Sequence, residues 1–274
     1  MFVPCSKEQG FPNWAEFSLI LPAISIGNVG QLAIDLVVSA LSPSHHLIGY
    51  LHDASILPVA GNDAFAKPGH ECGQLNTSAE VYKSDEQKLI VIQQRAPINK
   101  GYQALYCRKM TEWIKSCGFH RVILLSSISA TERVDSQMQG SSLRYLVSKA
   151  SEGLVKSFDN LSWTRLEKKP TYPDIDQDNK DKEYTYFIPG GGITKRMFDL
   201  CNNKDIPLTV LLTFCSEGDN ISDAVRLFYY LNEWFTIIDK EKVESKLAGK
   251  PSDFIIPSSW SLMFGSPLAP LPLF

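Results

Sequence analysis

The sequence has no long hydrophobic run, no excess of charge of either sign and no paired-cysteine motif. Its longest apolar stretches, residues 122–125 and 208–214, are far shorter than the roughly 18 residues that indicate a membrane-spanning helix. The 27 lysines and arginines are balanced by 30 aspartates and glutamates and form no basic cluster, so the usual electrostatic signature of nucleic-acid binding is missing. We therefore expect neither a membrane nor a nucleic-acid partner.

The six cysteines are scattered over 274 residues without a Cys-x-x-Cys pair, which favours free thiols in a reducing compartment. The first ten residues include Pro4, Lys7 and Glu8 and contain no positively charged segment followed by an apolar core. We therefore expect no secretory signal peptide.

Side chains that could bind a metal ion do not occur at suitable spacing. The five histidines form no ligand pattern with cysteine or acidic residues. Asp174, Asp176 and Asp178 have the alternate spacing of a calcium-binding loop, but Asn179 stands where the loop needs glycine and Thr185 where it needs glutamate. We interpret this segment as an exposed charged loop, and we expect no metal and no cofactor.

The sequence also lacks a nucleophile motif. It contains no Gly-x-Ser-x-Gly, and Ser126, Ser127 and Ser129, which follow an apolar run, have no base nearby in the sequence. A noncatalytic protein is therefore favoured over an enzyme.

Two glycine-containing segments leave one alternative open. Gly27 and Gly30 precede a helical pattern, and a triple glycine begins at Gly190 in a loop that runs to Lys195. Glycine lets the backbone approach a phosphate at a helix start, but neither segment has the full spacing of a dinucleotide or phosphate loop. We favour close backbone packing. The alternative is an α/β enzyme or a nucleotide- or anion-binding protein that uses the loop from Gly190 to Lys195.

Strand and helix patterns alternate along the chain, which indicates an α/β fold. Residues 17–26 have the pattern of a strand, Gly27 that of a turn, and residues 29–41 that of a helix. Residues 122–125 and 208–214 are continuous apolar runs, which are typical of parallel strands covered on both faces. We predict a mostly parallel sheet flanked by helices.

Local signals mark several element boundaries. One helix is predicted to end at Gly118, which suits a left-handed carboxyl-terminal cap. The clearest helix follows Asn220, the predicted amino-terminal cap. Its apolar residues recur every three or four positions: Ile221, Ala224, Val225, Phe228, Leu231, Phe235 and Ile238. Pro22 cannot donate a hydrogen bond within a sheet, so its strand is expected at an edge or to be irregular there.

We expect a single globular domain over residues 1–250 and an extended, proline-rich apolar tail over residues 251–274. Prolines prevent a continuous helix and favour an extended chain. Residues 254–264 are expected to pack on the domain, because large exposed apolar patches are rare. The last segment, residues 268–274, is expected to enter a partner, because partner pockets commonly capture an extended apolar end with a free carboxylate.

Five separated strings cover nearly the whole chain. They are MFVPC at the start, ISIGNVGQLAIDL at 24–36, IPGGGITK at 188–195, SEGDN at 216–220 and IPSSWSLMFGS at 256–266. Together they resemble the proteasome assembly chaperone 2 family. The resemblance implies a noncatalytic protein of the cytoplasm and nucleus that forms a heterodimer with proteasome assembly chaperone 1. The pair would bind α subunits of the 20S proteasome, promote formation of the α ring and prevent aberrant α-ring dimers.

The resemblance also implies a role for the tail. Related proteasome-binding proteins insert a tail that ends in hydrophobic-Tyr-any residue between α subunits, whereas this chain has leucine at the tyrosine position. The residues expected to bind the partner are Leu271, Pro272, Leu273 and Phe274.

Three aromatic residues, Tyr229, Tyr230 and Trp234, lie off the main apolar stripe of their helix and are candidates for the heterodimer surface. The alternative is that they lie at the edge of the domain's own core.

Overall fold

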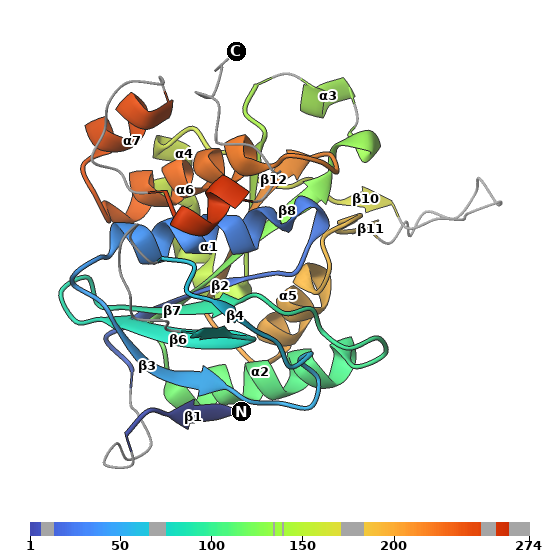
Figure 1. Cartoon of the computed structure of the whole chain (residues 1–274). Helices are drawn as coiled ribbons and strands as arrows, with labels where there is room; N and C mark the ends of the chain where they lie inside the picture. Colours follow the sequence, from blue (N-terminus) through green and yellow to red (C-terminus); the bar gives the residue numbers. More distant parts are fainter. Residues whose placement is uncertain are drawn as a thin grey trace.

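A computed structural model describes residues 1–6, 14–65, 75–133, 135–138, 140–170, 184–247 and 256–262. Its main feature is an eight-stranded mixed sheet with the order β1-β3-β6-β7-β2-β8-β12-β9 (Figure 1). The strands, in that order, are Phe2–Pro4, His46–Leu51, Ala79–Ser84, Leu89–Gln94, Ser18–Pro22, Arg121–Ser129, Leu208–Cys215 and Leu143–Val147.

The four central strands, β7, β2, β8 and β12, are parallel, and antiparallel strands form both margins. Every residue of β2, β7 and β12 is buried, as expected for strands with helices on both faces. The predicted α/β fold with a mostly parallel sheet is therefore confirmed.

One face of the sheet is covered by α1 (Val29–Ala40) and α6 (Ile221–Phe235), which pack against each other. The apolar stripe predicted for α6 is confirmed, because Ile221, Ala224, Val225, Phe228 and Leu231 are all buried in the core of this face. The short helices α4 (Val155–Asn160) and α7 (Lys240–Leu247) lie at the same side (Figure 1).

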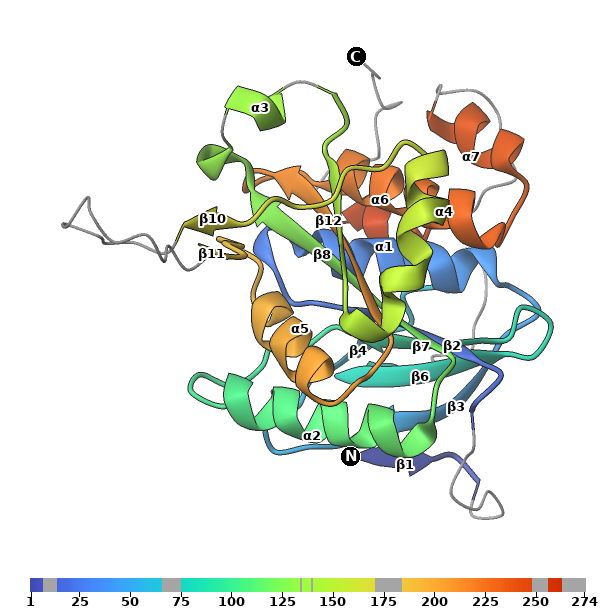
Figure 2. The same ribbon diagram turned by 180° about the vertical axis from the view of Figure 1, so that it is seen from behind.

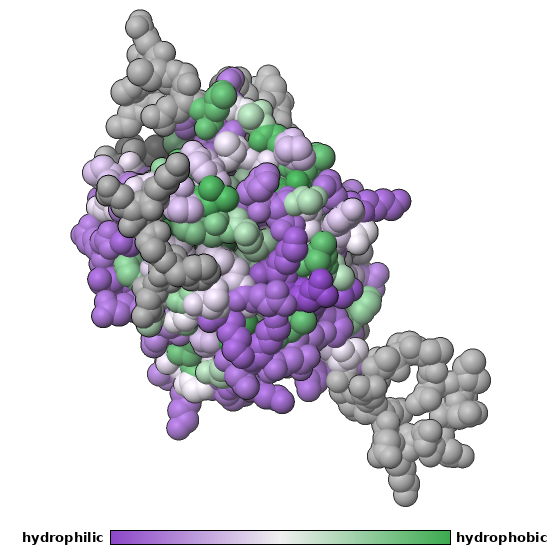
Figure 3. Space-filling view, turned by 90° about the horizontal axis from the view of Figure 1, so that it is seen from below, coloured by the Kyte–Doolittle hydropathy of each residue, from purple (hydrophilic) through white to green (hydrophobic). Residues whose placement is uncertain are grey.

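The opposite face is covered by α2 (Gln103–Cys117) and α5 (Thr194–Asn203), as the reverse view shows (Figure 2). Helix α2 ends at Gly118, whose φ of 69° confirms the predicted left-handed cap. Its outer residues Arg108, Glu112 and Lys115 are exposed. The surface seen from below is accordingly mostly hydrophilic, with hydrophobic side chains in small groups (Figure 3).

Smaller elements complete the fold. Two small two-stranded sheets are formed by β4 (Ala60–Asn62) with β5 (Leu75–Thr77) and by β10 (Lys169–Pro170) with β11 (Tyr184–Thr185). The remaining short helices are η1 (Ile26–Asn28), η2 (Ala130–Glu132), α3 (Asp135–Met138), η3 (Lys149–Leu154) and η4 (Ser258–Leu262).

Two local predictions are corrected by the structure. Pro22 does not mark an edge strand, because β2 lies between β7 and β8; Pro22 is its last residue, and the pairing with β7 covers only residues 18–20. Asn220 precedes α6 as predicted, but its side chain does not cap the helix and donates to the carbonyl of Gly218 instead. The Asp219 carboxylate accepts the hydrogen bond from the Ile221 amide.

Among the helices that the structure describes, none combines the length and the apolar character needed to cross a membrane.

The five cysteines of the described ranges are free thiols, in agreement with the prediction. Cys5 is exposed, whereas Cys107, Cys117, Cys201 and Cys215 are buried. Burial raises the thiol pKa to about 12 for Cys107 and Cys201 and to about 11 for Cys117 and Cys215.

Native alkylation is expected to separate these cysteines. At pH 8, iodoacetamide should label Cys5 and leave Cys107 and Cys201 unlabelled, because the thiolate is the nucleophile and a pKa near 12 leaves only about one thiol in ten thousand ionised. The measurement is mass spectrometry of digested protein, with urea-unfolded chain as the control. Equal labelling of Cys5 and Cys107 in the folded chain would contradict the packing described.

The same pKa values make stability fall at high pH. Folding raises each thiol pKa above its ordinary value of 9.0, so the folded chain binds more protons than the unfolded chain between pH 9 and the folded pKa. The contribution of these thiols is therefore complete below about pH 9 and declines as the pH rises toward 12.

Candidate functional site

The carboxyl edge of the parallel strands, where α/β proteins commonly bind ligands, holds a cluster of buried hydroxyl groups. The Ser25 and Ser127 hydroxyl oxygens are 2.7 Å apart, and those of Ser126 and Thr194 are 2.6 Å apart. Ser127 also donates to the carbonyl of Ile26. The hydrogen bonds of this cluster involve hydroxyl and backbone groups, with no imidazole or carboxylate to act as a base. The cluster joins loops to the sheet and has no general base for catalysis.

The glycine loop packs directly against the strand-to-helix connection after β2. A Cβ atom at Gly192, which has a φ of +55°, would lie 1.8 Å from the carbonyl oxygen of Ile24. The carbonyl of Gly190 accepts a hydrogen bond of 2.7 Å from the Ile26 amide. These contacts confirm the interpretation of the triple glycine as close backbone packing.

The same loop offers few donors to an anion. The amides of Gly191 and Thr194 donate to the carbonyls of Ile188 and Gly191, and Lys195 pairs with Asp199 at 3.3 Å. Gly30 is likewise a packing residue, since a Cβ there would lie 2.3 Å from the carbonyl oxygen of Leu125. The geometry therefore gives no support to the nucleotide- or anion-binding alternative.

The carboxyl-terminal segment docks on α1 through what we call the C-terminal anchor, residues 256–260. Trp260 is 2% exposed, and its indole Nε1 donates to the Asp35 carboxylate at 3.2 Å. The Ser259 amide and the Ser258 hydroxyl both donate to the carbonyl of Ala64 at 3.3 Å. The prediction that residues 254–264 pack on the domain is thus confirmed for the described part, residues 256–260.

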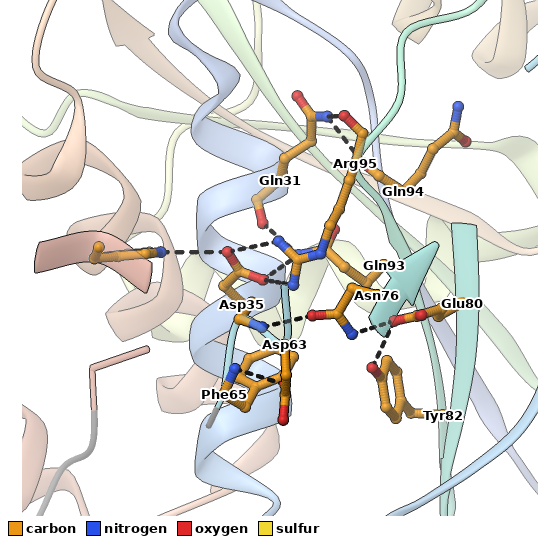
Figure 4. A network of polar contacts seen from close by, with 12 residues as sticks. Gln31, Asp35, Asp63, Phe65, Asn76, Glu80, Tyr82, Gln93, Gln94 and Arg95 are labelled. Carbon is orange, nitrogen blue, oxygen red and sulfur yellow. Dashed lines mark hydrogen bonds and ion pairs between the residues drawn. The ribbon is translucent and has the colours of Figure 1, made fainter. Parts of the chain in front are cut away.

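Asp35 is the centre of a buried polar network at the middle of α1 (Figure 4). Arg95 donates to both carboxylate oxygens, at 2.7 Å and 3.3 Å, and Gln93 donates to one of them at 2.5 Å. With Trp260, Asp35 therefore joins α1, the end of β7 and the C-terminal anchor. The signal in the sequence was a single acidic residue within the apolar segment VGQLAIDLVV, but nothing in the sequence identified its partners.

A second buried carboxylate supports the other side of the anchor. Glu80 is 1% exposed and accepts hydrogen bonds from the Asn76 side chain, the Thr77 amide and the Tyr82 hydroxyl at 2.7–2.9 Å. Burial and the neighbouring Glu80 raise the pKa of Tyr82, so the hydroxyl keeps its proton and remains a donor. Asn76 in turn accepts from the amide of Ala64, whose carbonyl binds the anchor.

The three aromatic residues proposed for a heterodimer surface are engaged within their own domain. The Trp234 ring lies 4.9 Å from that of Phe158, and the Tyr230 hydroxyl is 2.7 Å from that of Ser141. Tyr229 and Tyr230 are also half-buried against the α6 core. The structure thus confirms the alternative, that these residues form the edge of the domain's own core.

Two predicted segments lie outside the described residues. They are the tail residues Leu271, Pro272, Leu273 and Phe274, and the charged loop that contains Asp174, Asp176 and Asp178. Within the described ranges, no group of three histidine, cysteine, aspartate or glutamate side chains could hold a metal ion.

Comparison with known proteins gives a consistent result. The model of the PAC2 family matches residues 19–234. Proteasome assembly chaperone 2 of Nematostella vectensis is 60% identical over 89% of this chain and 99% of its own length. Its Homo sapiens namesake is 41% identical over 98% of this chain and 99% of its own length.

Solved structures share the fold at low sequence identity. PbaA of Pyrococcus furiosus, described as an archaeal homologue of proteasome-assembly chaperone, has a TM-score of 0.60 at 15% identity over 86% of this chain and 88% of its own. PbaB of the same organism, an archaeal proteasome activator, has a TM-score of 0.56 at 14% identity over 90% and 93%.

The similar proteins are named as chaperones rather than as enzymes, and the prediction that this chain is not an enzyme is confirmed. The match to the family model covers most of the sheet and the helices on both of its faces, from β2 to α6. The chain belongs to the PAC2 family.

Proposed function

We propose that the chain is a noncatalytic chaperone of 20S proteasome assembly. The observation that carries the proposal is identity of 40–60% to proteins named proteasome assembly chaperone 2, over nearly the full length of both sequences. The buried hydroxyl cluster without a base and the tightly packed glycine loop agree with a protein that acts by binding other proteins.

The proposal includes specific partners. The chain forms a heterodimer with proteasome assembly chaperone 1 in the cytoplasm and nucleus. The pair binds α subunits of the 20S proteasome, promotes α-ring formation and prevents aberrant α-ring dimers. Support comes from the five family strings in the sequence and from the relatives' names.

The C-terminal anchor provides a physical basis for tail binding. Trp260 fixes the chain on the α1 side of the domain, and residues 261–274 can span at most about 50 Å when fully extended. Such a segment can reach a pocket on a neighbouring subunit while the domain covers another surface of the same partner. In this proposal the binding residues are Leu271, Pro272, Leu273 and Phe274.

The function is tested by co-expressing the full-length chain with proteasome assembly chaperone 1 and the seven α subunits. We expect the tagged chain to co-purify with chaperone 1 and α subunits, and we expect native gels to show more single α rings and fewer α-ring dimers than without it. Chaperone 1 expressed alone is the control. A monodisperse, folded chain that captures neither chaperone 1 nor α subunits would refute the proposal.

Replacing Leu271, Leu273 and Phe274 by serine is expected to weaken α-subunit binding at least about tenfold, because the tail then loses its apolar contacts. The midpoint of thermal unfolding should stay within about 1 °C, since the substitutions lie beyond the anchor. Biolayer interferometry with immobilised α subunits measures the first effect and calorimetry the second. Pro272→Ala, which keeps all three apolar side chains, is the matched control. Unchanged affinity of the triple variant would exclude this tail as a binding element.

A further inference from the structure

The Asp35 network lies beside a topological switch point of the sheet. Strands β2 and β7 are adjacent and parallel. The helix after β2, α1, packs on one face, whereas the helix after β7, α2, packs on the other. In open α/β sheets, the crevice at the carboxyl ends of two such strands is the usual place for a ligand.

The structure has a pocket at this position. Its volume is about 250 Å³, room for roughly eight water molecules at about 30 Å³ each. Its walls come from the first turns of α1, including Gln31, and from the end of β7, including Gln93 and Arg95. Ser259 and Trp260 of the C-terminal anchor complete the lining.

Three buried polar atoms of these wall residues have no hydrogen-bond partner in the described part of the chain. They are Oε1 of Gln31, Oε1 of Gln93 and Nε of Arg95. The two amide orientations are fixed, because Nε2 of Gln31 donates to the Gln94 carbonyl and Nε2 of Gln93 donates to the Gln31 carbonyl and to Asp35. The unpaired set is therefore two acceptors and one donor. Gln93 is only 1% exposed, so its unpaired oxygen lies where water cannot readily compensate for it.

The charges of the pocket cancel. Asp35 and Arg95 form an ion pair with two hydrogen bonds, which leaves neither sign in excess. An anion would meet the Asp35 carboxylate and two amide oxygens, and a cation would meet the Arg95 guanidinium. The pocket thus favours an uncharged group.

We propose that this pocket binds a primary carboxamide. Such a group has two N–H donors and one carbonyl acceptor, which is the complement of the two glutamine oxygens and the Arg95 Nε–H. The carboxamide approaches from the Trp260 side, where the indole provides an apolar wall. Its source is either a free small molecule or the side chain of a glutamine or asparagine in a peptide, since both present the same chemistry.

The proposal is tested by titrating the full-length, ¹⁵N-labelled chain with nicotinamide and following amide and indole resonances. We expect saturable shifts of the Gln31 and Gln93 side-chain amides and of the Trp260 indole N–H, with a Kd on the order of 1 mM for a ligand of this size. Nicotinate has the same shape without the two donors, and it should bind at least about tenfold more weakly. N-acetylglutamine methylamide is the peptide-like probe, and tighter binding of this probe than of nicotinamide identifies a protein side chain as the source.

A variant pair isolates the pocket from general stability. Gln31→Ala should weaken nicotinamide binding about fivefold, because it removes one acceptor. Gln31 is only partly buried, and the matched control Gln103→Ala lies on α2, at the opposite face. No saturable shift up to about 50 mM nicotinamide, equal binding of nicotinate, or equal affinity of Gln31→Ala and the wild-type chain would each overturn the proposal.

Discussion

Gly192→Ala is expected to lower the free energy of unfolding by about 3 kcal/mol or more. The added Cβ would lie 1.8 Å from the Ile24 carbonyl oxygen, and the backbone at residue 192 has a φ of +55°, which favours glycine. Neither chain can move aside at low cost, because the amides of Ile26 and Ser129 donate to Gly190 and Pro189 of the same loop. Urea unfolding followed by circular dichroism measures the change.

Gly153→Ala is the control for this substitution. Gly153 lies in η3 without a positive φ, and a Cβ built there meets no atom within 4 Å. Its replacement should change stability by no more than about 1 kcal/mol, with stabilisation favoured because alanine restricts the unfolded chain. If Gly192→Ala were as stable as Gly153→Ala, the loop could not pack on Ile24 as described. An anion-binding role for the glycines would then regain support.

The contrast between these two glycines shows what sequence patterns can predict. Periodicity identified α6 and the buried strands β8 and β12, because burial on one or both faces leaves a regular apolar pattern. The sequence also predicted the left-handed cap at Gly118, a local event between neighbouring residues. The reason for three successive glycines could not be predicted, since the atom that excludes a side chain at residue 192 belongs to Ile24, far away along the chain.

Strand order was beyond the sequence for the same reason. Pro22 suggested an edge or an irregularity, and the structure instead places β2 at the centre of the sheet. The strand tolerates the proline because Pro22 is its last residue, beyond the part that pairs with β7. A missing donor therefore constrains one hydrogen bond and not the position of the strand.

The candidate site was only partly visible in the sequence. The apolar composition of residues 254–264 predicted that they pack on the domain, which the burial of Trp260 confirms for the described part. Its partner Asp35 lies 225 positions earlier, and a single buried carboxylate in an apolar helix does not reveal which donors surround it. Contacts of this kind depend on the tertiary arrangement of α1, β7 and the anchor.

Trp260→Ala is expected to lower the free energy of unfolding by about 3–5 kcal/mol, the usual cost of removing a buried tryptophan side chain. The indole is 2% exposed, and its Nε1 donates to Asp35. Trp260→Phe keeps most of the apolar contact and loses only this donor. It should cost about 1 kcal/mol, because Asp35 still accepts from Arg95 and Gln93. Denaturant unfolding of the three chains measures both effects, with Phe187→Ala, which removes a 45% exposed ring, as the surface control.

The same substitution tests whether the anchor acts through the tail. If the anchor positions residues 271–274 for the α subunits, Trp260→Ala should weaken binding, measured at a temperature where the variant is fully folded, by up to the same factor as the triple serine variant of the tail. Combining the two changes should then weaken binding little further, because the second removes a contact already lost. Fully additive losses would show that the anchor and the tail contribute independently. No loss from Trp260→Ala would restrict the role of Trp260 to stability of the fold.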